Sequence, residues 1–393
     1  MKPAAVCVTG ASVLSPLGDS LGALEEGLLA GRRTVGETPD LPGVASSQIA
    51  DFDATRYATV RGLRLYNRTT RLGIAATKLA LVDAGLDGGG VPAEDLGVVT
   101  ATTFGHLDTL IEYDRGLVTL GLQRTNPALM PLALASAPGA MIALAFGARA
   151  FSTTVGDGAA SGVNALGLGA RLVAEGRARA CVVVGAFAPC HELLVSAARA
   201  GRLAAPGEFR VADRQSRGMA FGEAAAAMVL ERVDEARARG AAARALLHGQ
   251  ASAFAMDSDR ARALGRACRS ALQTAEVAAS ELALVSACAN GLPDDDRDES
   301  EALASVLGDA RPPILAVKAN LGEMMDASGL LQALAAACAL RSRQAPPIAG
   351  QEELRDGSVH RSRGTTALRS GSALVTAIND WGTAAALVLS VAP

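Results

Sequence analysis

The segment Asp157–Gly162, with the sequence DGAASG, has the form of a site for a catalytic nucleophile. It follows a strand-like run, Ser152–Val155, and opens a strongly apolar helix. At a helix N-terminus, the dipole and the free backbone N–H groups lower the pKa of a nucleophile, as acyl transfer requires. The segment nevertheless contains no Cys or His, and Ser161 carries its only hydroxyl. The sequence therefore predicts a nucleophile position from which the reacting group is missing.

The elements that must position this segment are short apolar runs that alternate with longer helical stretches. This alternation predicts an α/β fold with largely buried sheets. We expect strands at Val6–Thr9, Leu96–Thr102, Ala180–Gly185, Ala226–Glu231, Leu282–Cys288, Ile314–Val317, Ser372–Ile378 and Ala384–Ser390. We expect helices at Thr70–Gly85, Gly162–Gly176 and Ser328–Arg341.

A charged, alanine-rich stretch, Arg232–Arg244, divides the chain. We place the boundary between two halves there, at residues 1–245 and 246–393. Residues 350–371 combine charge with Gly and Ser, which predicts an exposed loop.

Composition limits the classes of function. Half of the residues are hydrophobic, which predicts a large core and further burial in an oligomer. The net charge of −3 gives no indication of nucleic-acid binding. The six cysteines show no metal-binding spacing, so we expect buried, reduced thiols and no metal. No signal peptide and no apolar run of membrane-spanning length is apparent, so we expect a cytoplasmic protein without a membrane segment.

Several motifs in one order resemble the β-ketoacyl synthases over more than 350 residues. The opening VCVTGASVLSPLG is similar to that family's first strand and turn, and Ala212–Glu223, ADRQSRGMAFGE, to its FDxxxxGxxxGEG stretch. Lys318–Gly322 matches the first five positions of KxxxGH. The resemblance implies a thiolase-type five-layer α-β-α-β-α fold made of two duplicated halves. It also implies a dimer formed through the strand Ser152–Val155.

The resemblance places the family's catalytic positions on residues that cannot perform its condensation. The nucleophilic Cys corresponds to Ala159, the first His to Cys288 and the second His to Glu323, while the Lys is retained as Lys318. The two His of the family stabilise the enolate formed on decarboxylation. An ionised Glu323 about 4 Å from that charge would cost on the order of 4 kcal/mol at an effective dielectric of 20. The family's Gly-rich gate loop reads Asn379-Asp380-Trp381-Gly382, with Asp380 in place of Phe.

A member without a nucleophile resembles the ketosynthase β-subunit, or chain-length factor, of type II polyketide synthases. The resemblance implies that a Cys-bearing ketosynthase α-subunit supplies the chemistry and that a tunnel for the growing chain runs along the heterodimer. The chain would be carried on the phosphopantetheine of an acyl carrier protein, mainly through the α-subunit, with no cofactor bound to this chain. The gate that sets chain length corresponds to a helix that offers Thr109, Leu110, Glu112, Tyr113 and Gly116.

Two differences from the chain-length factors of aromatic pathways favour a system that makes reduced or polyene chains. Chain-length factors of aromatic pathways usually carry Gln where this chain has Ala159, and a gate helix rich in Phe. The stretch from Gly105 to Gly116 contains no Phe.

Other interpretations stay open. Cys288 beside Lys318 and Glu323 could serve an independent decarboxylase or acyltransferase, or it could simply fill the volume of the missing His. The chain could also be a purely structural partner of the α-subunit. Lys318 and Glu323 are expected to form a structural ion pair.

Further polar residues near these positions favour structural roles. Asp157 is expected to cap the helix or to interact with its dipole. Asp294–Asp296 is expected to form a solvated loop, and His106 to be a packed or surface residue.

Overall fold

The computed structural model describes residues 4–354, 359 and 364–391. Its main sheet contains ten strands in the order β11-β10-β14-β15-β9-β1-β8-β6-β4-β5. The first five belong to the C-terminal part of the chain and the last five to the N-terminal part. Within the main sheet, the two parts are joined where Val6–Val8 of β1 pairs with Ala245–Leu247 of β9. Numbered within its own half, each group has the strand order 3-2-4-5-1, which is the duplication expected from the resemblance.

The N-terminal strands are β1 (Val6–Leu14), β4 (Leu96–Ala101), β5 (Phe151–Val155), β6 (Ala180–Phe187) and β8 (Ala224–Arg232). The C-terminal strands are β9 (Ala245–Phe254), β10 (Leu282–Ser286), β11 (Ile314–Leu315), β14 (Ser372–Ile378) and β15 (Thr383–Ser390). β5 ends the sheet on one side, so one of its edges pairs with no other strand among the described residues. The predicted strands are confirmed, and β1 continues to Leu14 beyond its predicted end.

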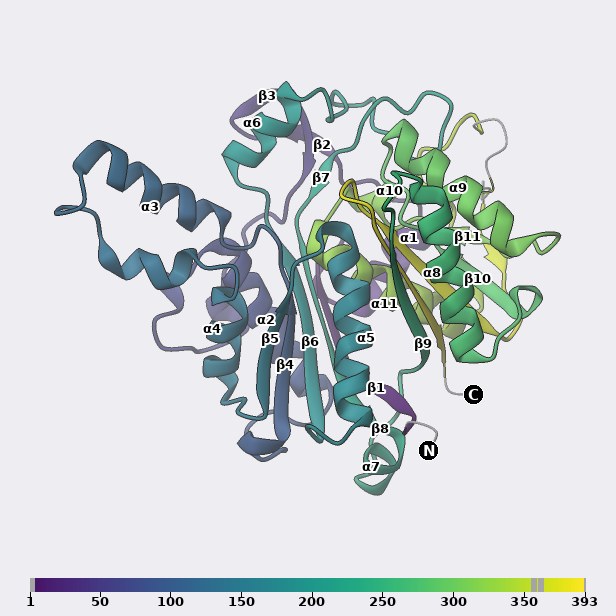
Figure 1. Cartoon of the computed structure of the whole chain (residues 1–393), viewed down its shortest axis with the longest axis horizontal. Helices are drawn as coiled ribbons and strands as arrows, with labels where there is room; N and C mark the ends of the chain where they lie inside the picture. Colours follow the sequence, from purple (N-terminus) through teal and green to yellow (C-terminus); the bar gives the residue numbers. More distant parts are fainter. Residues whose placement is uncertain (1–3, 355–358, 360–363, 392–393) are drawn as a thin grey trace.

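Helices and sheets alternate in five layers (Figure 1). Helices α2 (Arg68–Asp83) and α4 (Ala137–Phe146) cover the outer face of the N-terminal strands. Helices α5 (Ser161–Ala174) and α11 (Ser328–Ser342) form the central layer, between the N-terminal and the C-terminal strands. Helices α8 (Arg260–Ala275) and α9 (Pro293–Leu307) cover the outer face of the C-terminal strands. The predicted α/β thiolase-type fold is therefore confirmed.

The side chains of each strand alternate between layers because successive residues point to opposite faces. Along β6, Cys181 and Val183 belong to the core around α5 and α11. Val182 and Val184 belong to the core beneath α2. β14 divides in the same way between the central core and the core beneath α8. Sheets buried on both faces explain why the strands read as continuous apolar runs.

The three predicted helices exist, with ends shifted by up to two residues. α2 begins at Arg68 because the side chain of Asn67 accepts a hydrogen bond from the Thr70 backbone N–H at 2.9 Å. Asn at an N-cap supplies a partner for a backbone donor that the helix itself leaves free.

The remaining elements surround this frame. The remaining helices are α1 (Leu21–Leu29), α3 (Leu107–Leu120), α6 (His191–Arg199), α7 (Val233–Ala238) and α10 (Lys318–Leu321). The short 3-10 helices are η1 (Ala54–Arg56), η2 (Leu63–Leu65), η3 (Ala93–Asp95), η4 (Pro127–Ala133), η5 (Gly158–Ala160), η6 (Ala279–Glu281) and η7 (Met325–Ala327). A small sheet joins β2 (Gly36–Thr38), β3 (Leu41–Ser47) and β7 (Phe221–Gly222).

Part of the predicted loop at 350–371 forms a strand. β13 (Thr366–Ala367) pairs with β12 (Gln344–Ala345), and both residues of β13 are exposed. Residues 355–358 and 360–363 of this stretch lie outside the described residues.

Helix α3 and the segment η4 project from the body as an arm (Figure 1). Within the described residues, no single helix is long and apolar enough to cross a membrane. One pair, η4 and α4, passes that test of length and composition only when taken together, and it is bent by 93°.

Candidate functional site

Ala159 lies in η5, the turn that joins β5 to α5, and its side chain is buried. The preceding Gly158 has φ 56°, and a β-carbon there would lie 3.2 Å from the ring of Trp381. Glycine is therefore required at 158 by both backbone conformation and space. The predicted passage from a strand into an apolar helix at this point is confirmed.

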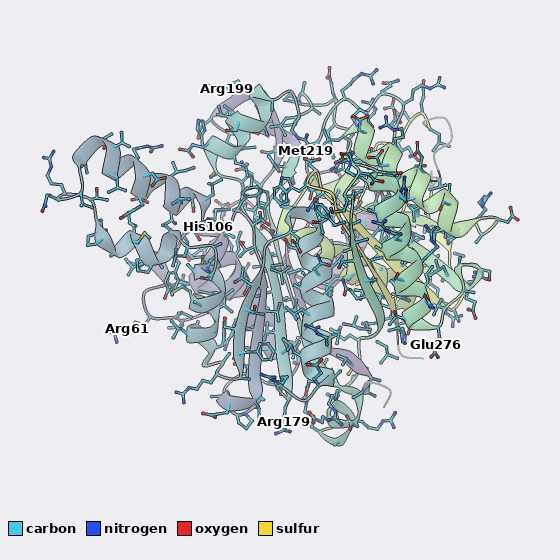
Figure 2. The ribbon with its side chains drawn as sticks, viewed as in Figure 1. Arg61, His106, Arg179, Arg199, Met219 and Glu276 are labelled. Carbon is cyan, nitrogen blue, oxygen red and sulfur yellow. The ribbon has the colours of Figure 1, made fainter. Side chains whose placement is uncertain are left out.

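A cavity of about 230 Å³ lies in front of this turn. The residues singled out by sequence that line it are Ala159, Asp295, Glu323, Asn379, Asp380 and Trp381. Its apolar wall includes Phe104, Leu193, Met219, Phe221 and Trp381. Figure 2 labels Met219 in the upper central part of the molecule. Residues from both halves of the chain thus meet at one cavity.

Lys318 and Glu323 form the predicted ion pair, with Lys318 Nζ 2.6 Å from Glu323 Oε2. Their side chains are 1% and 2% exposed, so the pair is buried. Burial has the largest single effect and lowers the pKa of Lys318, but Glu323, Cys288 and Glu299 together raise it, and the net shift is upward. The other oxygen, Glu323 Oε1, accepts hydrogen bonds from the Met325 backbone N–H and from Ser328 Oγ, both at 2.8 Å. The carboxylate is thus fully engaged in holding the turn before α11.

Cys288 is buried just after β10. Burial, together with the nearby Glu299 carboxylate, raises the pKa of its thiol well above the ordinary value. Glu299 is itself fixed, since its Oε1 accepts from the Cys288 backbone N–H at 2.8 Å and from the hydroxyl of Thr376. A thiol in these surroundings supplies little thiolate at neutral pH, so it is a poor nucleophile.

At pH 8, we expect Cys288 in the native protein to react with iodoacetamide at least about tenfold more slowly than in the urea-unfolded chain. The reason is that each unit of pKa increase lowers the thiolate fraction about tenfold. Peptide mass spectrometry of the 288-containing fragment measures both rates. Equal rates in the two states would show that the thiol is accessible and reactive.

A buried carboxylate beside the turn, Asp326, was missed from the sequence. Its Oδ1 accepts from Thr103 Oγ1 at 2.6 Å and from Ser161 Oγ at 2.8 Å, and its Oδ2 accepts from the Thr103 backbone N–H at 2.8 Å. Burial raises the pKa of Asp326 to about 6, while these hydrogen bonds act in the opposite direction. The carboxylate thus ties the end of β4 to the start of α5.

The same network engages Ser161, the only hydroxyl of the opening segment. Ser161 Oγ accepts from the Asp157 backbone N–H at 2.7 Å while it donates to Asp326, and the residue is fully buried. It therefore stabilises the turn and is not presented to the cavity. The signal for Asp326 in the sequence was an acidic residue inside the otherwise apolar run Met324–Ala327.

The expectation that Asp294–Asp296 is a solvated loop was wrong. The three residues form the first turn of α9, and Asp295 and Asp296 are buried. Asp296 accepts from the backbone N–H groups of Asn290, at 2.9 Å, and Ala212, at 2.7 Å. Buried carboxylates need such donors, and the loops that supply them come from distant parts of the chain.

The predicted capping role of Asp157 is also not observed, since its side chain accepts no hydrogen bond from the backbone at the helix start. Asp157 Oδ2 instead accepts from the side chain of Asn164 at 2.8 Å. The cysteines are all free, with four buried, and Cys190 and Cys338 half-buried.

The five gate residues lie on α3, in the projecting arm. Thr109 is buried, Leu110, Tyr113 and Gly116 are half-buried, and Glu112 is exposed. None of the five lines the Ala159 cavity. A β-carbon at Gly116 would lie 3.2 Å from Thr125 Cγ2, so this glycine faces the returning segment of the arm. The role of these residues in chain length stays a prediction.

His106 immediately precedes α3, at the base of the arm (Figure 2). It is half-buried, and burial lowers the pKa of its imidazole. This placement fits the expectation of a packed residue.

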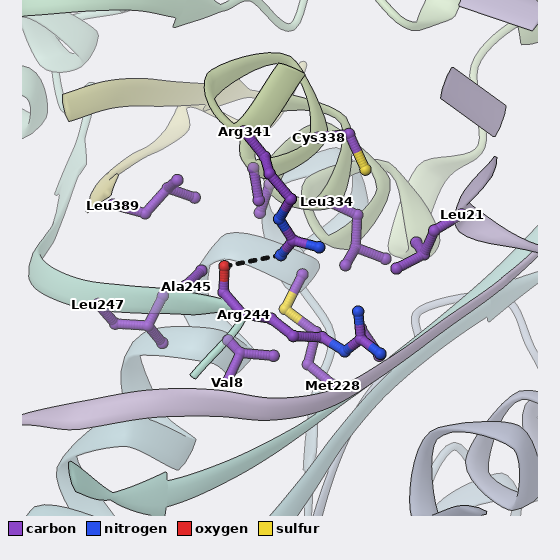
Figure 3. Close-up of a pocket in the computed structure, with 13 residues that line it drawn as sticks. Val8, Leu21, Met228, Arg244, Ala245, Leu247, Leu334, Cys338, Arg341 and Leu389 are labelled. Atoms are coloured by element: carbon purple, nitrogen blue, oxygen red, sulfur yellow. Dashed lines mark hydrogen bonds between the residues drawn. The ribbon is translucent and has the colours of Figure 1, made fainter. Parts of the chain in front are cut away.

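A second cavity lies between α11 and the sheet (Figure 3). Met228, Leu334 and Cys338 are among the residues that line it, and Arg341 Nη2 donates to the Arg244 carbonyl at its edge, at 3.0 Å. Its volume of about 20 Å³ leaves room for little more than one water molecule. It is a packing defect of the central layer.

Comparison with known proteins identifies the family. The family described as "Beta-ketoacyl synthase, N-terminal domain" matches residues 4–236, and "Beta-ketoacyl synthase, C-terminal domain" matches residues 238–352. The ketoacyl synthase α-subunit of the tetracenomycin polyketide synthase from Streptomyces glaucescens is 31% identical over 377 residues, covering 88% of this chain and 87% of the relative. The β-subunit of the same synthase is 29% identical over 405 residues and covers 98% of both chains.

Among solved structures, the ishigamide ketosynthase/chain length factor matches with a TM-score of 0.90 and 26% identity, and the match covers 100% of both chains. Sequence, fold and the order of the motifs agree along the whole described chain. The chain belongs to the β-ketoacyl synthase family.

Proposed function

We propose that this chain is the non-catalytic β-subunit, or chain-length factor, of a type II polyketide ketosynthase. In this role it pairs with a Cys-bearing α-subunit, and the heterodimer encloses the tunnel for the growing chain. The chain is delivered on the phosphopantetheine of an acyl carrier protein, which docks mainly on the α-subunit. The absence of Phe between Gly105 and Gly116 and the Ala at 159 support a system that makes reduced or polyene chains.

The observation that carries the proposal is the methyl group of Ala159 at the N-terminus of α5, facing the cavity. A methyl group cannot attack a thioester. The buried Lys318–Glu323 pair adds a carboxylate to the same cavity, where condensation develops negative charge. The relative that covers 98% of both chains is itself a β-subunit, which supports the same role.

The arm supplies an apolar surface for a partner. Its large apolar side chains are exposed, with Val118 86% and Leu122 75% accessible, and Leu120, Met130 and Leu134 also exposed. A patch of this kind on a soluble protein marks an interaction site. We assign the α-subunit as its occupant, since the proposed role requires a heterodimer.

Replacing Val118 with Glu is expected to weaken pairing with the α-subunit by at least about tenfold, because a charge is then buried without a partner. Size-exclusion chromatography and titration of the two purified subunits measure the change. The matched control is Val82→Glu, an exposed valine near the end of α2, outside the arm. Equal losses for both variants would place the interface elsewhere.

Intact mass spectrometry tests the function itself. The chain is incubated with acyl carrier protein loaded with substrate, with and without an α-subunit. We expect acyl mass on the α-subunit and none on this chain. Acyl mass on this chain would refute the proposal, and fragment masses would show whether Cys288 is the site.

Product length tests the assigned gate. Thr109→Phe in an active, stable pair is expected to shorten the product by at least one two-carbon unit, because a larger side chain leaves no volume for further extension. Leu65→Phe, an exposed position of η2, serves as the control. Unchanged product length with Thr109→Phe would favour the purely structural role.

The alternative of an independent acyl-processing enzyme receives less support. It would need Cys288 as nucleophile, and that thiol is buried with a raised pKa.

A further inference from the structure

We propose that Trp381 narrows the mouth of the Ala159 cavity and that two arginines hold it there by binding Asp380, so that a phosphopantetheine arm does not reach Ala159. The inference rests on the proposed function only in naming the phosphopantetheine arm as the excluded group. It concerns the loop Asn379–Gly382, which corresponds to the family's gate loop and which the proposed function does not use.

The loop is fastened to the segment that precedes Ala159. Asn379 Oδ1 accepts from the backbone N–H groups of Trp381, at 3.0 Å, and Thr383, at 2.9 Å. Asn379 Nδ2 donates to the backbone carbonyl of Asp157 at 2.7 Å. One side chain therefore both shapes the turn between β14 and β15 and joins it to the start of α5.

Two arginines from different parts of the chain converge on Asp380. Arg202, just after α6, forms an ion pair with Asp380 Oδ2, and Arg260 Nη1 lies 3.5 Å from Asp380 Oδ1. Arg260 is itself held by Asp295 and Asp298, each at 2.7 Å, and is only 15% exposed. The Asp380 carboxylate thus meets one cation that is already fixed in position.

This arrangement places Trp381 at the mouth of the cavity. The indole packs against Gly158, and its centroid lies 6.2 Å from that of Phe104 in an edge-on arrangement. Trp381 is 50% exposed and lines the cavity together with Ala159, so it stands between solvent and the turn. The cavity volume of about 230 Å³ falls below the roughly 300 Å³ at which ligand sites begin.

The test uses a cysteine at the turn as a reporter of access. Ala159→Cys is treated with two alkylating reagents of similar chemistry, iodoacetamide and a haloacetyl pantetheine. The ratio of the two rates cancels the intrinsic reactivity of the thiol and leaves the effect of reagent size. Peptide mass spectrometry follows the 159-containing fragment, and Cys190 serves as the internal reference.

In Ala159→Cys/Trp381→Ala we expect the ratio of the pantetheine-reagent rate to the iodoacetamide rate to rise at least about tenfold. Removing the indole would open the cavity to the larger reagent, as the opening of a lid does. Ala159→Cys/Trp381→Phe is expected to change this ratio much less, since Phe keeps most of the ring. Ala159→Cys/Arg202→Gln is expected to raise it by about fivefold, the scale of a partly exposed ion pair. Melting temperatures establish that each variant is folded.

An unchanged ratio in the Trp381→Ala background would overturn the proposal. A rise with Trp381→Ala but none with Arg202→Gln would overturn the part assigned to Arg202. Neither readout involves an α-subunit or condensation. Failure here therefore leaves the proposed function untouched, and acylation of the wild-type chain would refute that function without changing the ratio.

Discussion

Replacing Lys318 with Met is expected to lower the free energy of unfolding by about 3–5 kcal/mol, the cost of leaving one member of a buried ion pair without its partner. Lys318 is 1% exposed, and Glu323 Oε2 lies 2.6 Å from its ammonium group. Without that ammonium, the buried Glu323 carboxylate must remain charged without its counter-ion or take up a proton. The midpoint of urea unfolding, with the slope of the transition, measures the loss.

The double variant Lys318→Met/Glu323→Gln separates the charge from the packing. The Gln carbonyl still accepts from Met325 and Ser328, which now bond Glu323 Oε1, and no charge is left buried. Most of the lost stability is expected to return. A double variant as unstable as Lys318→Met would show that the lysine stem, and not the charge, matters.

The stability of the protein is expected to increase as Asp326 takes up a proton. The pKa of Asp326 is raised from 3.8 to about 6 in the folded state, so the folded chain binds this proton more tightly than the unfolded chain. The contribution is fully present below about pH 4 and is lost as the pH rises through about 6. The pKa difference corresponds to on the order of 3 kcal/mol.

Asp326→Asn provides the control, because it has no proton to bind. The difference in unfolding midpoint between the wild type and Asp326→Asn, measured from pH 4.5 to 7, isolates the single group from the other carboxylates. We expect wild type to gain relative to the variant as the pH falls. A constant difference across this range would mean that burial does not shift the pKa of Asp326.

The sequence by itself determined the fold class and the family of this protein. Short apolar runs such as Ala180–Gly185 predict strands buried on both faces, and the structure confirms this one as part of β6. The order of the motifs identified the family, and the turn at Asp157–Gly162 could be predicted because a strand, glycines and an apolar helix follow one another locally. Lys318 and Glu323 lie five residues apart, so their ion pair could also be predicted from the sequence.

The tertiary structure decided which polar groups meet across long distances in the chain. Asp326 bonds Thr103 and Ser161, and Asp296 bonds the backbone of Ala212. These contacts connect different layers of the fold, and no local pattern encodes them. Asp294–Asp296 therefore looked solvated in the sequence, although two of the three are buried.

The same reason applies to the loop Asn379–Gly382. In the sequence, Asp380 and Trp381 were departures from a glycine-rich gate. Only the fold brings Arg202, Arg260 and Gly158 to them, because the electrostatic and packing partners of a short loop are set by the elements around it. The sequence places an alanine, Ala159, at the start of the apolar helix, and the tertiary structure shows that Trp381 lines the same cavity.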